Sequence, residues 1–301
     1  MKKIFVIFFS VLLFGRAFGA DNCTSPKAYT VDKRCYVTDE QKTYAPYNAV
    51  VAVLKNGKVF CTGTIVNVDG KPYLYTAKHC VREDDGVIKP KLLIRLQDGR
   101  EIYAIRNNVG DYETRAKENY DVGDWAVYSL TESNVPMVKQ TMNNKQTTFG
   151  IFNFDYLAKM IGYGSLKIMS DAEIAEFKQR YMNYLKAEYS VDSLGTGHLE
   201  GFREGGFKTQ NKLVAAFIKN NKDYWRSLVN DINNLKVSYC TYSSTGKDLD
   251  CQGWGGNSGG GIFDKEGRIM AIHTRGQGII GGGGHARADG NESLLRDAEK
   301  R

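Results

Sequence analysis

The sequence predicts an all-β protein that carries one helical insertion. Between residues 47 and 145, apolar runs of strand length are separated by Asn56-Gly57, Asp69-Gly70 and Asp98-Gly99, dipeptides that favour tight turns between antiparallel strands. These runs are 49–54, 59–68, 73–77, 92–96, 101–105 and 125–130. Roughly six antiparallel strands in one segment imply a barrel or a sandwich. Residues 166–235 instead show the spacing of helices.

The first 20 residues have the pattern of an export signal. Lys2 and Lys3 precede an apolar run from Ile4 to Phe14, and the small residues of Ala17-Phe18-Gly19-Ala20 follow, as in a cleavable signal peptide. The apolar run has eleven residues, whereas a membrane-spanning helix needs about 20. We therefore expect a secreted or periplasmic protein with no stable membrane anchor.

The charge distribution argues against nucleic-acid binding. The net charge of +7 falls to +4 when Lys2, Lys3 and Arg16 leave with the signal peptide. The remaining basic residues are scattered among acidic ones, and no nucleic-acid-binding motif is visible. A nucleic-acid-binding surface would concentrate lysine and arginine on one face, so we expect no nucleic-acid partner.

Six cysteines in an exported chain predict disulfides. The pairs that lie close in the sequence are Cys23 with Cys35, Cys61 with Cys80, and Cys240 with Cys251. Six cysteines allow about 15 pairings, so the connectivity stays open. No pair has the C-x-x-C spacing of a zinc site, which makes metal binding the weaker alternative.

Ser258 lies in a glycine-rich segment. The segment Gly255-Gly256-Asn257-Ser258-Gly259-Gly260-Gly261 is followed directly by a strand-like run. Glycines permit left-handed backbone and allow consecutive amides to point at one site, where an oxyanion would be bound. A serine hydroxyl becomes a strong nucleophile only when a base removes its proton. The segment alone is also consistent with a flexible loop, so the base must be found elsewhere in the chain.

His79 and Asp124 are the candidates for the base and for the acid that orients it. His79 ends a strand-like run within Thr76-Ala77-Lys78-His79-Cys80, and Asp124 directly precedes the run 125–130. An aspartate that accepts the imidazole N–H holds the histidine in the tautomer that takes a serine proton. The alternatives are a histidine that caps a strand and an aspartate that ends a turn. Asp121 is the rival acid, and we prefer Asp124 because its strand would anchor it.

Together, three segments resemble the signatures of the chymotrypsin-like serine proteases. They are Thr76-Ala77-Lys78-His79-Cys80, Asp124-Trp125-Ala126-Val127 and Gly256-Asn257-Ser258-Gly259-Gly260. They follow the family's order, and His79 precedes Asp124 by 45 residues, much as in that family. The resemblance covers residues 47–164 and 237–276. It implies two packed antiparallel six-stranded β-barrels, with the site in the cleft between them.

The resemblance also implies an organisation and a set of roles. The expected parts are a signal peptide at 1–20, an N-terminal arm at 21–46, a first barrel at 47–145, a second barrel at 146–290 with the helical insertion 166–235, and a tail at 291–301. Ser258 would attack the peptide carbonyl, His79 would carry the proton, and Asp124 would orient His79. The backbone amides of Gly256 and Ser258 would bind the oxyanion. No cofactor or metal is implied.

Further details resemble the bacterial branch of the family, especially the glutamyl endopeptidases. Animal enzymes carry an aspartate at the position of Asn257, and it pairs with a newly cut N-terminus to form the oxyanion hole. Because Asn257 is uncharged, we expect no such ion pair here. Cys61-Thr62-Gly63-Thr64 resembles the strand whose cysteine is paired with the one after the histidine. A bridge from Cys61 to Cys80 would fix the backbone that carries His79.

The segment 268–276 is expected to line the primary specificity pocket. The candidate substrate-binding residues are Gln252, His273, Thr274, Arg275 and Gly276. His273 matches a histidine that helps glutamyl endopeptidases bind an acidic side chain, and His273 and Arg275 would offer charge-assisted hydrogen bonds to a carboxylate. The alternative is a structural His273 and a solvent-facing Arg275. Trp254 departs from the family pattern and would narrow the pocket.

The helical insertion begins at a capping box. Ser170-Asp171-Ala172-Glu173 has the S-x-x-E pattern in which the first and fourth residues satisfy each other's backbone amides. Apolar residues then recur at helical spacing at Ile174, Phe177, Tyr181, Tyr184 and Leu185. A second helix is expected, with either Asn221 or Asp223 as its N-cap. We expect this apolar stripe to pack on the second barrel, and the alternative is a lid over the site.

The sequence therefore predicts an exported serine endopeptidase that acts as a monomer on polypeptide substrates. The main alternative is a non-catalytic secreted binding or adhesion module built on a protease-like barrel, and a complete set of three catalytic residues argues against it. An esterase is a lesser alternative, because the Gly-x-Ser-x-Gly elbow of such enzymes joins a strand to a long helix, whereas Ser258 is followed by a strand-like run.

Overall fold

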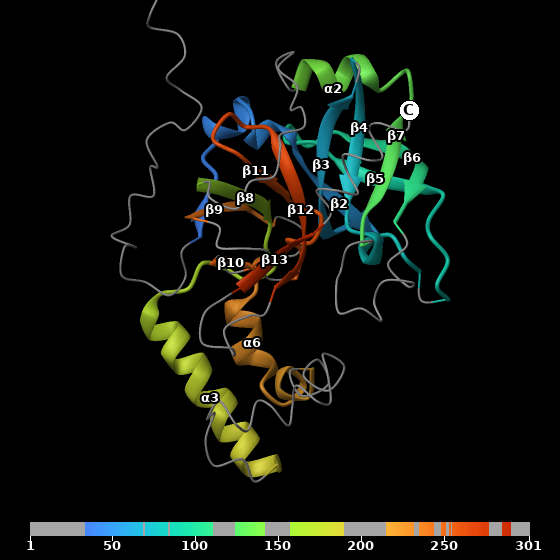
Figure 1. Cartoon of the computed structure of the whole chain (residues 1–301). Helices are drawn as coiled ribbons and strands as arrows, with labels where there is room; N and C mark the ends of the chain where they lie inside the picture. Colours follow the sequence, from blue (N-terminus) through green and yellow to red (C-terminus); the bar gives the residue numbers. More distant parts are fainter. Residues whose placement is uncertain are drawn as a thin grey trace, which may run out of the picture.

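The structure is a computed structural model of the 301-residue chain. It describes residues 34–68, 70–83, 85–110, 124–141, 157–189, 215–231, 235–243, 248–250, 253, 255–276 and 285–289. Two antiparallel β units lie side by side, and a helical part projects away from them (Figure 1). The predicted class, an all-β fold with a helical insertion, is confirmed.

The first unit is a closed six-stranded barrel. Its strands are β2 (Val50–Lys55), β3 (Lys58–Val68), β4 (Lys71–Thr76), β5 (Lys91–Arg95), β6 (Glu101–Val109) and β7 (Ala126–Leu130), joined in the order β2-β3-β4-β7-β6-β5. The predicted turns form as expected, with φ of 54° at Asn56 and of 73°, 78° and 87° at Gly57, Gly70 and Gly99. Alternate residues of each strand fill the barrel with side chains such as Val51, Ile65, Leu74, Ile94 and Tyr128.

The second unit is an antiparallel sheet of seven strands. In spatial order they are β1 (Cys35–Tyr36), β9 (Val237–Ser243), β8 (Leu157–Tyr163), β11 (Gly261–Phe263), β12 (Ile269–Gly276), β13 (His285–Asp289) and β10 (Asp248–Asp250). Six strands were expected. The additional strand is β1, which comes from the N-terminal arm and pairs with Tyr239 and Ser238 of β9. Cys35 and Tyr36 of the arm therefore belong to the second β unit.

The described helices are short outside the insertion. They are the 3₁₀ turns η2 (Gln41–Thr43), η3 (Tyr47–Ala49) and η4 (Lys78–Cys80) and the α-helices α2 (Val135–Thr141), α3 (Asp171–Tyr189) and α6 (Lys222–Leu228), and residues 215–220 are also helical. The predicted capping box is present at the start of α3. Ser170 N–H donates to Glu173 Oε2 at 2.9 Å, and Glu173 N–H donates to Ser170 Oγ at 3.3 Å. None of the described helices has the length and apolar character needed to cross a membrane.

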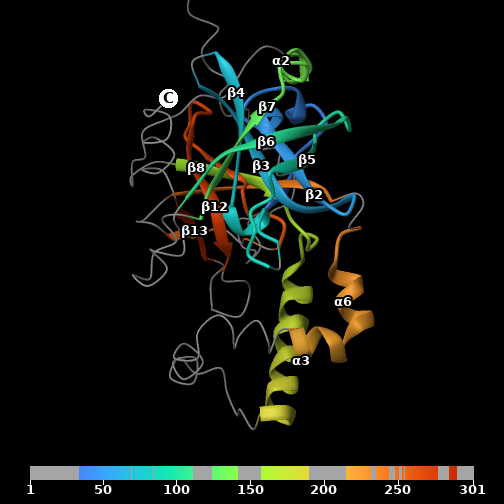
Figure 2. The same ribbon diagram turned by 90° about the vertical axis from the view of Figure 1, so that its right-hand side faces the viewer.

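The helical insertion has an apolar core of its own. Helices α3 and α6 extend together from the end of the second sheet (Figures 1 and 2). Phe177 and Tyr181 of α3 pack against Phe217, with ring centroids 5.7 and 5.2 Å apart. The expectation that this stripe packs on the second barrel is therefore wrong, because the residues around Phe217 supply the apolar partner face within the insertion.

Candidate active site

His79 and Asp124 come together because their strands are neighbours in the first barrel. His79 lies in η4, directly after β4, and Asp124 lies just before β7. Since β4 pairs with β7 and Thr76 lies opposite Ala126, the two residues meet at one end of these strands. The register of the barrel thus closes a separation of 45 residues in the sequence.

The Asp124 carboxylate binds His79 at two points. Its Oδ2 lies 2.7 Å from the imidazole Nδ1, and its Oδ1 accepts the backbone N–H of His79 at 2.9 Å. Asp124 is 2% exposed, whereas the His79 side chain is 42% exposed. A buried carboxylate in this position fixes Nδ1 as the protonated nitrogen and leaves Nε2 able to accept a proton.

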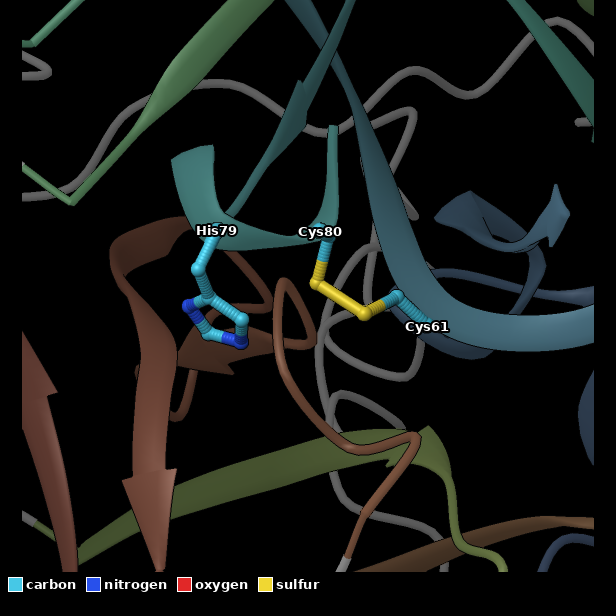
Figure 3. Close-up of side chains that lie close together, drawn as sticks. All are labelled: Cys61, His79 and Cys80. Atoms are coloured by element: carbon cyan, nitrogen blue, oxygen red, sulfur yellow. A yellow bond between two sulfur atoms is a disulfide. The ribbon is translucent and has the colours of Figure 1, made fainter. Parts of the chain in front are cut away.

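The Cys61–Cys80 disulfide lies directly beside His79 (Figure 3). It joins β3 to η4, so this predicted bridge is confirmed. A ring nitrogen of His79 and the two sulfur atoms all lie within 4.8 Å of one another. Because the sulfurs are bonded to each other, they do not form a metal site with the histidine. Cys35 and Cys240 are also disulfide-bonded, whereas Cys23 and Cys251 lie outside the described residues.

Ser258 lies on a loop of the second unit that contacts the first barrel. Its carbonyl accepts the N–H of Thr62 at 2.8 Å and lies 3.7 Å from the Cys80 sulfur. Its hydroxyl is 3.5 Å from the Thr274 carbonyl, at the limit of a hydrogen bond, and in the described part of the chain it makes none to His79. This weak contact leaves the Ser258 side chain able to turn toward His79, and catalytic hydrogen bonds of this kind often form fully only in the substrate complex.

The amides of Gly256 and Ser258 are oriented by the carbonyls that precede them. The Gly255 carbonyl accepts Ser165 N–H at 2.8 Å, and the Asn257 carbonyl accepts Gly260 N–H at 2.9 Å. In a trans peptide the N–H points opposite to the carbonyl, so both candidate amides are turned away from these partners. Within the described residues neither amide donates a hydrogen bond, which leaves both available for an oxyanion.

Gly256 cannot be replaced without a change of backbone. Its φ is +96°, and a Cβ at this position would lie 2.6 Å from the Tyr163 carbonyl oxygen. A methyl group there would displace the loop or β8, and the left-handed conformation adds strain for any other residue. The glycines of this segment thus set a tight loop geometry, which the flexible-loop alternative does not require.

Thr62 was not identified from the sequence as a site residue. Its hydroxyl donates to the Gly256 carbonyl at 2.6 Å and accepts the N–H of Tyr163 at 2.8 Å. One buried side chain of the first barrel therefore binds both β8 and the loop that carries Ser258 in the second unit. The only signal in the sequence was its place next to Cys61, which did not indicate a contact across the two units.

His273 is a buried, neutral side chain. It is 1% exposed, and burial lowers its pKa to about 3, helped by the nearby positive charge that His79 can carry. A neutral imidazole N–H still forms a charge-assisted hydrogen bond with an ionised carboxylate, because only one partner has to carry a charge, so the expected role of His273 in binding an acidic side chain stays a prediction. Its Nδ1 and the Thr274 hydroxyl are both buried and find no hydrogen-bond partner in the described part of the chain.

Several predicted residues cannot be placed. Asp121, Gln252 and Trp254 lie outside the described residues. Arg275 and Gly276 close β12, but only the backbone of Arg275 is described.

Comparison with known proteins identifies the fold. Residues 24–109, which span part of the arm and most of the first barrel, match the family described as lysyl endopeptidase, C-terminal domain. The solved structure of a Glu endopeptidase in complex with MPD superposes with a TM-score of 0.50 at 15% identity, covering 90% of this chain and 98% of that one. The chain has the chymotrypsin-like fold.

Other solved structures with the chymotrypsin-like fold match less well. The thermostable serine protease AL20 from an extremophilic microorganism gives a TM-score of 0.48 at 12% identity, with coverage of 84% of this chain and 96% of that one. The protease Anisep from Arthrobacter nicotinovorans gives 0.46 at 13% identity, with coverage of 84% and 94%. A sequence search among curated proteins finds no match.

Proposed function

We propose that the protein is an exported serine endopeptidase that cleaves peptide bonds through an acyl-enzyme. The observation that carries the proposal is the double contact between His79 and the buried Asp124 carboxylate, at 2.7 and 2.9 Å. A histidine that only capped a strand would not need a buried acid on its ring nitrogen. Ser258 lies on a loop bound to the same end of the first barrel, where it can meet the free face of the imidazole.

The proposed residues divide the steps of this reaction between them. Ser258 Oγ attacks the substrate carbonyl while its proton passes to His79 Nε2, and Asp124 stabilises the imidazolium that forms. The carbonyl oxygen becomes an oxyanion that the amides of Gly256 and Ser258 bind. The tetrahedral intermediate then collapses, and His79 gives the proton to the leaving amine. A water molecule, deprotonated by His79, hydrolyses the acyl-enzyme by the same steps.

We also propose that the residue before the cut is acidic. The buried, unpartnered Nδ1 of His273 and hydroxyl of Thr274 support this, since a substrate carboxylate would satisfy polar atoms that otherwise lack partners. The lysyl name of the matched family does not bear on this choice, because the match ends at residue 109, well before β12. The wild-type protein should hydrolyse a Glu-containing peptide faster than its Gln counterpart, and His273→Ala should lose this preference. A basic preference would refute it.

The proposal that the protein is exported is supported by two features. The N-terminal segment has the composition of a signal peptide, and the disulfide beside His79 requires an oxidising compartment to form and persist. Fractionation of expressing cells should recover the protein outside the cytoplasm with its N-terminus cut near residue 20.

Labelling with a fluorophosphonate tests the catalytic proposal directly. The wild-type protein should be labelled covalently, and Ser258→Ala should not be labelled. Ser227→Ala, which changes an exposed serine of α6, is the matched control and should be labelled like the wild type. A folded wild-type protein that fails to react would instead favour the non-catalytic binding module.

A further inference from the structure

Residues 255–260 form the loop that carries the proposed oxyanion amides, here called the oxyanion loop. It lacks the charge pair that organises this loop in animal enzymes, because residue 257 is an asparagine. We propose that Arg34, in the N-terminal arm, is the positioning residue that holds this loop in its active conformation. This inference rests on the proposed serine endopeptidase function. The N-terminal arm would thereby take part in catalysis through this residue.

Arg34 is a fully buried arginine. It is 0% exposed and directly precedes β1, whose pairing with β9 fixes its backbone. Its guanidinium donates to the carbonyl of Leu166 at 3.2 Å and to that of Lys167 at 3.1 Å. Burying a guanidinium is costly unless its hydrogen bonds are made, and a structural need would be met as well by apolar packing. We therefore attribute the burial of this charge to the positioning of the residues that Arg34 binds.

The carbonyls that Arg34 binds belong to the segment that orients the Gly256 amide. The N–H of Ser165, the residue just before Leu166, donates to the Gly255 carbonyl at 2.8 Å. That hydrogen bond turns the N–H of Gly256 the other way, toward the position of an oxyanion. A shift of the segment 165–167 would therefore release the peptide whose orientation the reaction needs.

Asn230 also holds the same segment. The N–H of Asn230 donates to the Ser165 carbonyl, and its Nδ2 donates to the Gly164 carbonyl at 2.7 Å. Two polar residues thus bind residues 164–167: Arg34 from the arm and Asn230 from the end of the insertion. Arg34 is the charged member of this pair and the one that also approaches Asn257.

Arg34 and Asn257 border the same point in space. A Cβ added to Gly164 would lie 3.1 Å from Arg34 Nη1 and 3.3 Å from Asn257 Oδ1. Both side chains are 0% exposed, so a buried guanidinium and the Asn257 amide oxygen both lie within contact distance of the space that a side chain at Gly164 would fill. We infer that Arg34 supplies the positive group near residue 257, in place of a chain terminus.

Kinetics of Arg34→Gln and Arg34→Lys test the proposal. Because misplacement of a positioned group costs about 10²-fold in rate, Arg34→Gln should lower kcat about 100-fold and leave KM within about threefold. The affinity for a peptide aldehyde, which forms a tetrahedral adduct on Ser258, should fall in parallel. Arg34→Lys keeps the charge and should recover at least tenfold of the loss. Arg226→Gln, an exposed arginine of α6, is the matched control and should behave as wild type.

A double-mutant cycle separates a charge effect from general loss of packing. Asn257→Asp places a carboxylate beside the guanidinium in the wild-type background but leaves it buried without that cation in Arg34→Gln. The loss of kcat caused by Asn257→Asp should therefore be at least tenfold greater in the Arg34→Gln background. Equal losses in both backgrounds would overturn the proposal, as would an Arg34→Gln variant with wild-type kcat and aldehyde affinity.

Two further measurements ensure that the result decides for or against the role of Arg34. If Arg34→Gln does not fold, Gly164→Ala decides, because its methyl group separates Arg34 from Asn257; kcat must fall with little change in KM, and an unchanged kcat refutes the role. Failure of the proposed function would appear differently, as a folded wild-type protein that fluorophosphonate does not label. An active wild type with an equally active Arg34→Gln would refute only the role of Arg34.

Discussion

Replacement of Asp124 by asparagine tests the orientation of His79 without removing volume. The Asn oxygen can keep the hydrogen bond from the His79 backbone N–H, now 2.9 Å long. Its NH₂ group then takes the place of the carboxylate oxygen that lies 2.7 Å from Nδ1. Two donors cannot face each other, so Nδ1 must lose its proton and Nε2 must carry it. The imidazole can then no longer accept the proton of Ser258.

The expected loss is about 10⁴-fold in kcat, with KM within about threefold. This corresponds to about 5.5 kcal/mol of transition-state stabilisation, since each tenfold is about 1.4 kcal/mol. The assay is steady-state hydrolysis of a peptide, together with the rate of fluorophosphonate labelling, which should fall in parallel. Asp264→Asn is the control, because Asp264 is also buried and accepts hydrogen bonds, from Arg268, at the far end of β11. A kcat within tenfold of wild type in Asp124→Asn would refute the reasoning.

Four further outcomes are expected. Replacing Cys61 and Cys80 together by alanine should lower the free energy of unfolding by about 3 kcal/mol, given a separation of 19 residues; urea denaturation measures this, and a loss below about 1 kcal/mol would contradict it. The pKa of His273 is lowered from 6.5 to about 3, first by burial and then by His79. Between these two pH values the unfolded chain binds a proton that the folded protein does not. The free energy of unfolding should therefore be unaffected by His273 above about pH 6.5 and fall as the pH drops toward 3, by up to about 1.4 kcal/mol per pH unit. His273→Gln should flatten that part of the stability curve, and parallel curves for the two proteins would speak against it. Glu173→Ala opens the capping box of α3 and should cost about 1 kcal/mol of local stability by hydrogen exchange, with kcat/KM unchanged; slower hydrolysis would instead connect the insertion to the site. Gly256→Ala should lower kcat at least about 10²-fold, because its Cβ has no room beside the Tyr163 carbonyl; a fully active variant would show that the loop tolerates a side chain.

The hairpins and the helix start were predictable because each depends on residues adjacent in the chain. Asn56-Gly57 adopts positive φ at both positions, which is what the dipeptide favours between antiparallel strands. Ser170 and Glu173 exchange their capping hydrogen bonds three residues apart. Nothing distant has to form first, so composition and spacing were sufficient.

The sequence also indicated His79 and Asp124 as partners, but the reason for their contact is not local. They meet because β4 and β7 are neighbours in a closed barrel with Thr76 opposite Ala126. The surface against which the apolar face of α3 packs was predicted wrongly for a related reason. A spacing of three and four residues shows that α3 has an apolar face, whereas the identity of the surface it meets, here around Phe217, depends on packing.

Local patterns thus specified the strands, turns and capping box of this protein and the candidate nucleophile, base and acid. Long-range packing specified how they are held. Cys35 and Tyr36 are too short a run to show a strand period, yet their pairing with β9 brings Arg34 to the carbonyl of Leu166 across 132 residues. Thr62 reaches Gly256 across 194. Hydrogen bonds of this kind leave no periodic signal in a sequence, because their partners become neighbours only when the two β units pack together.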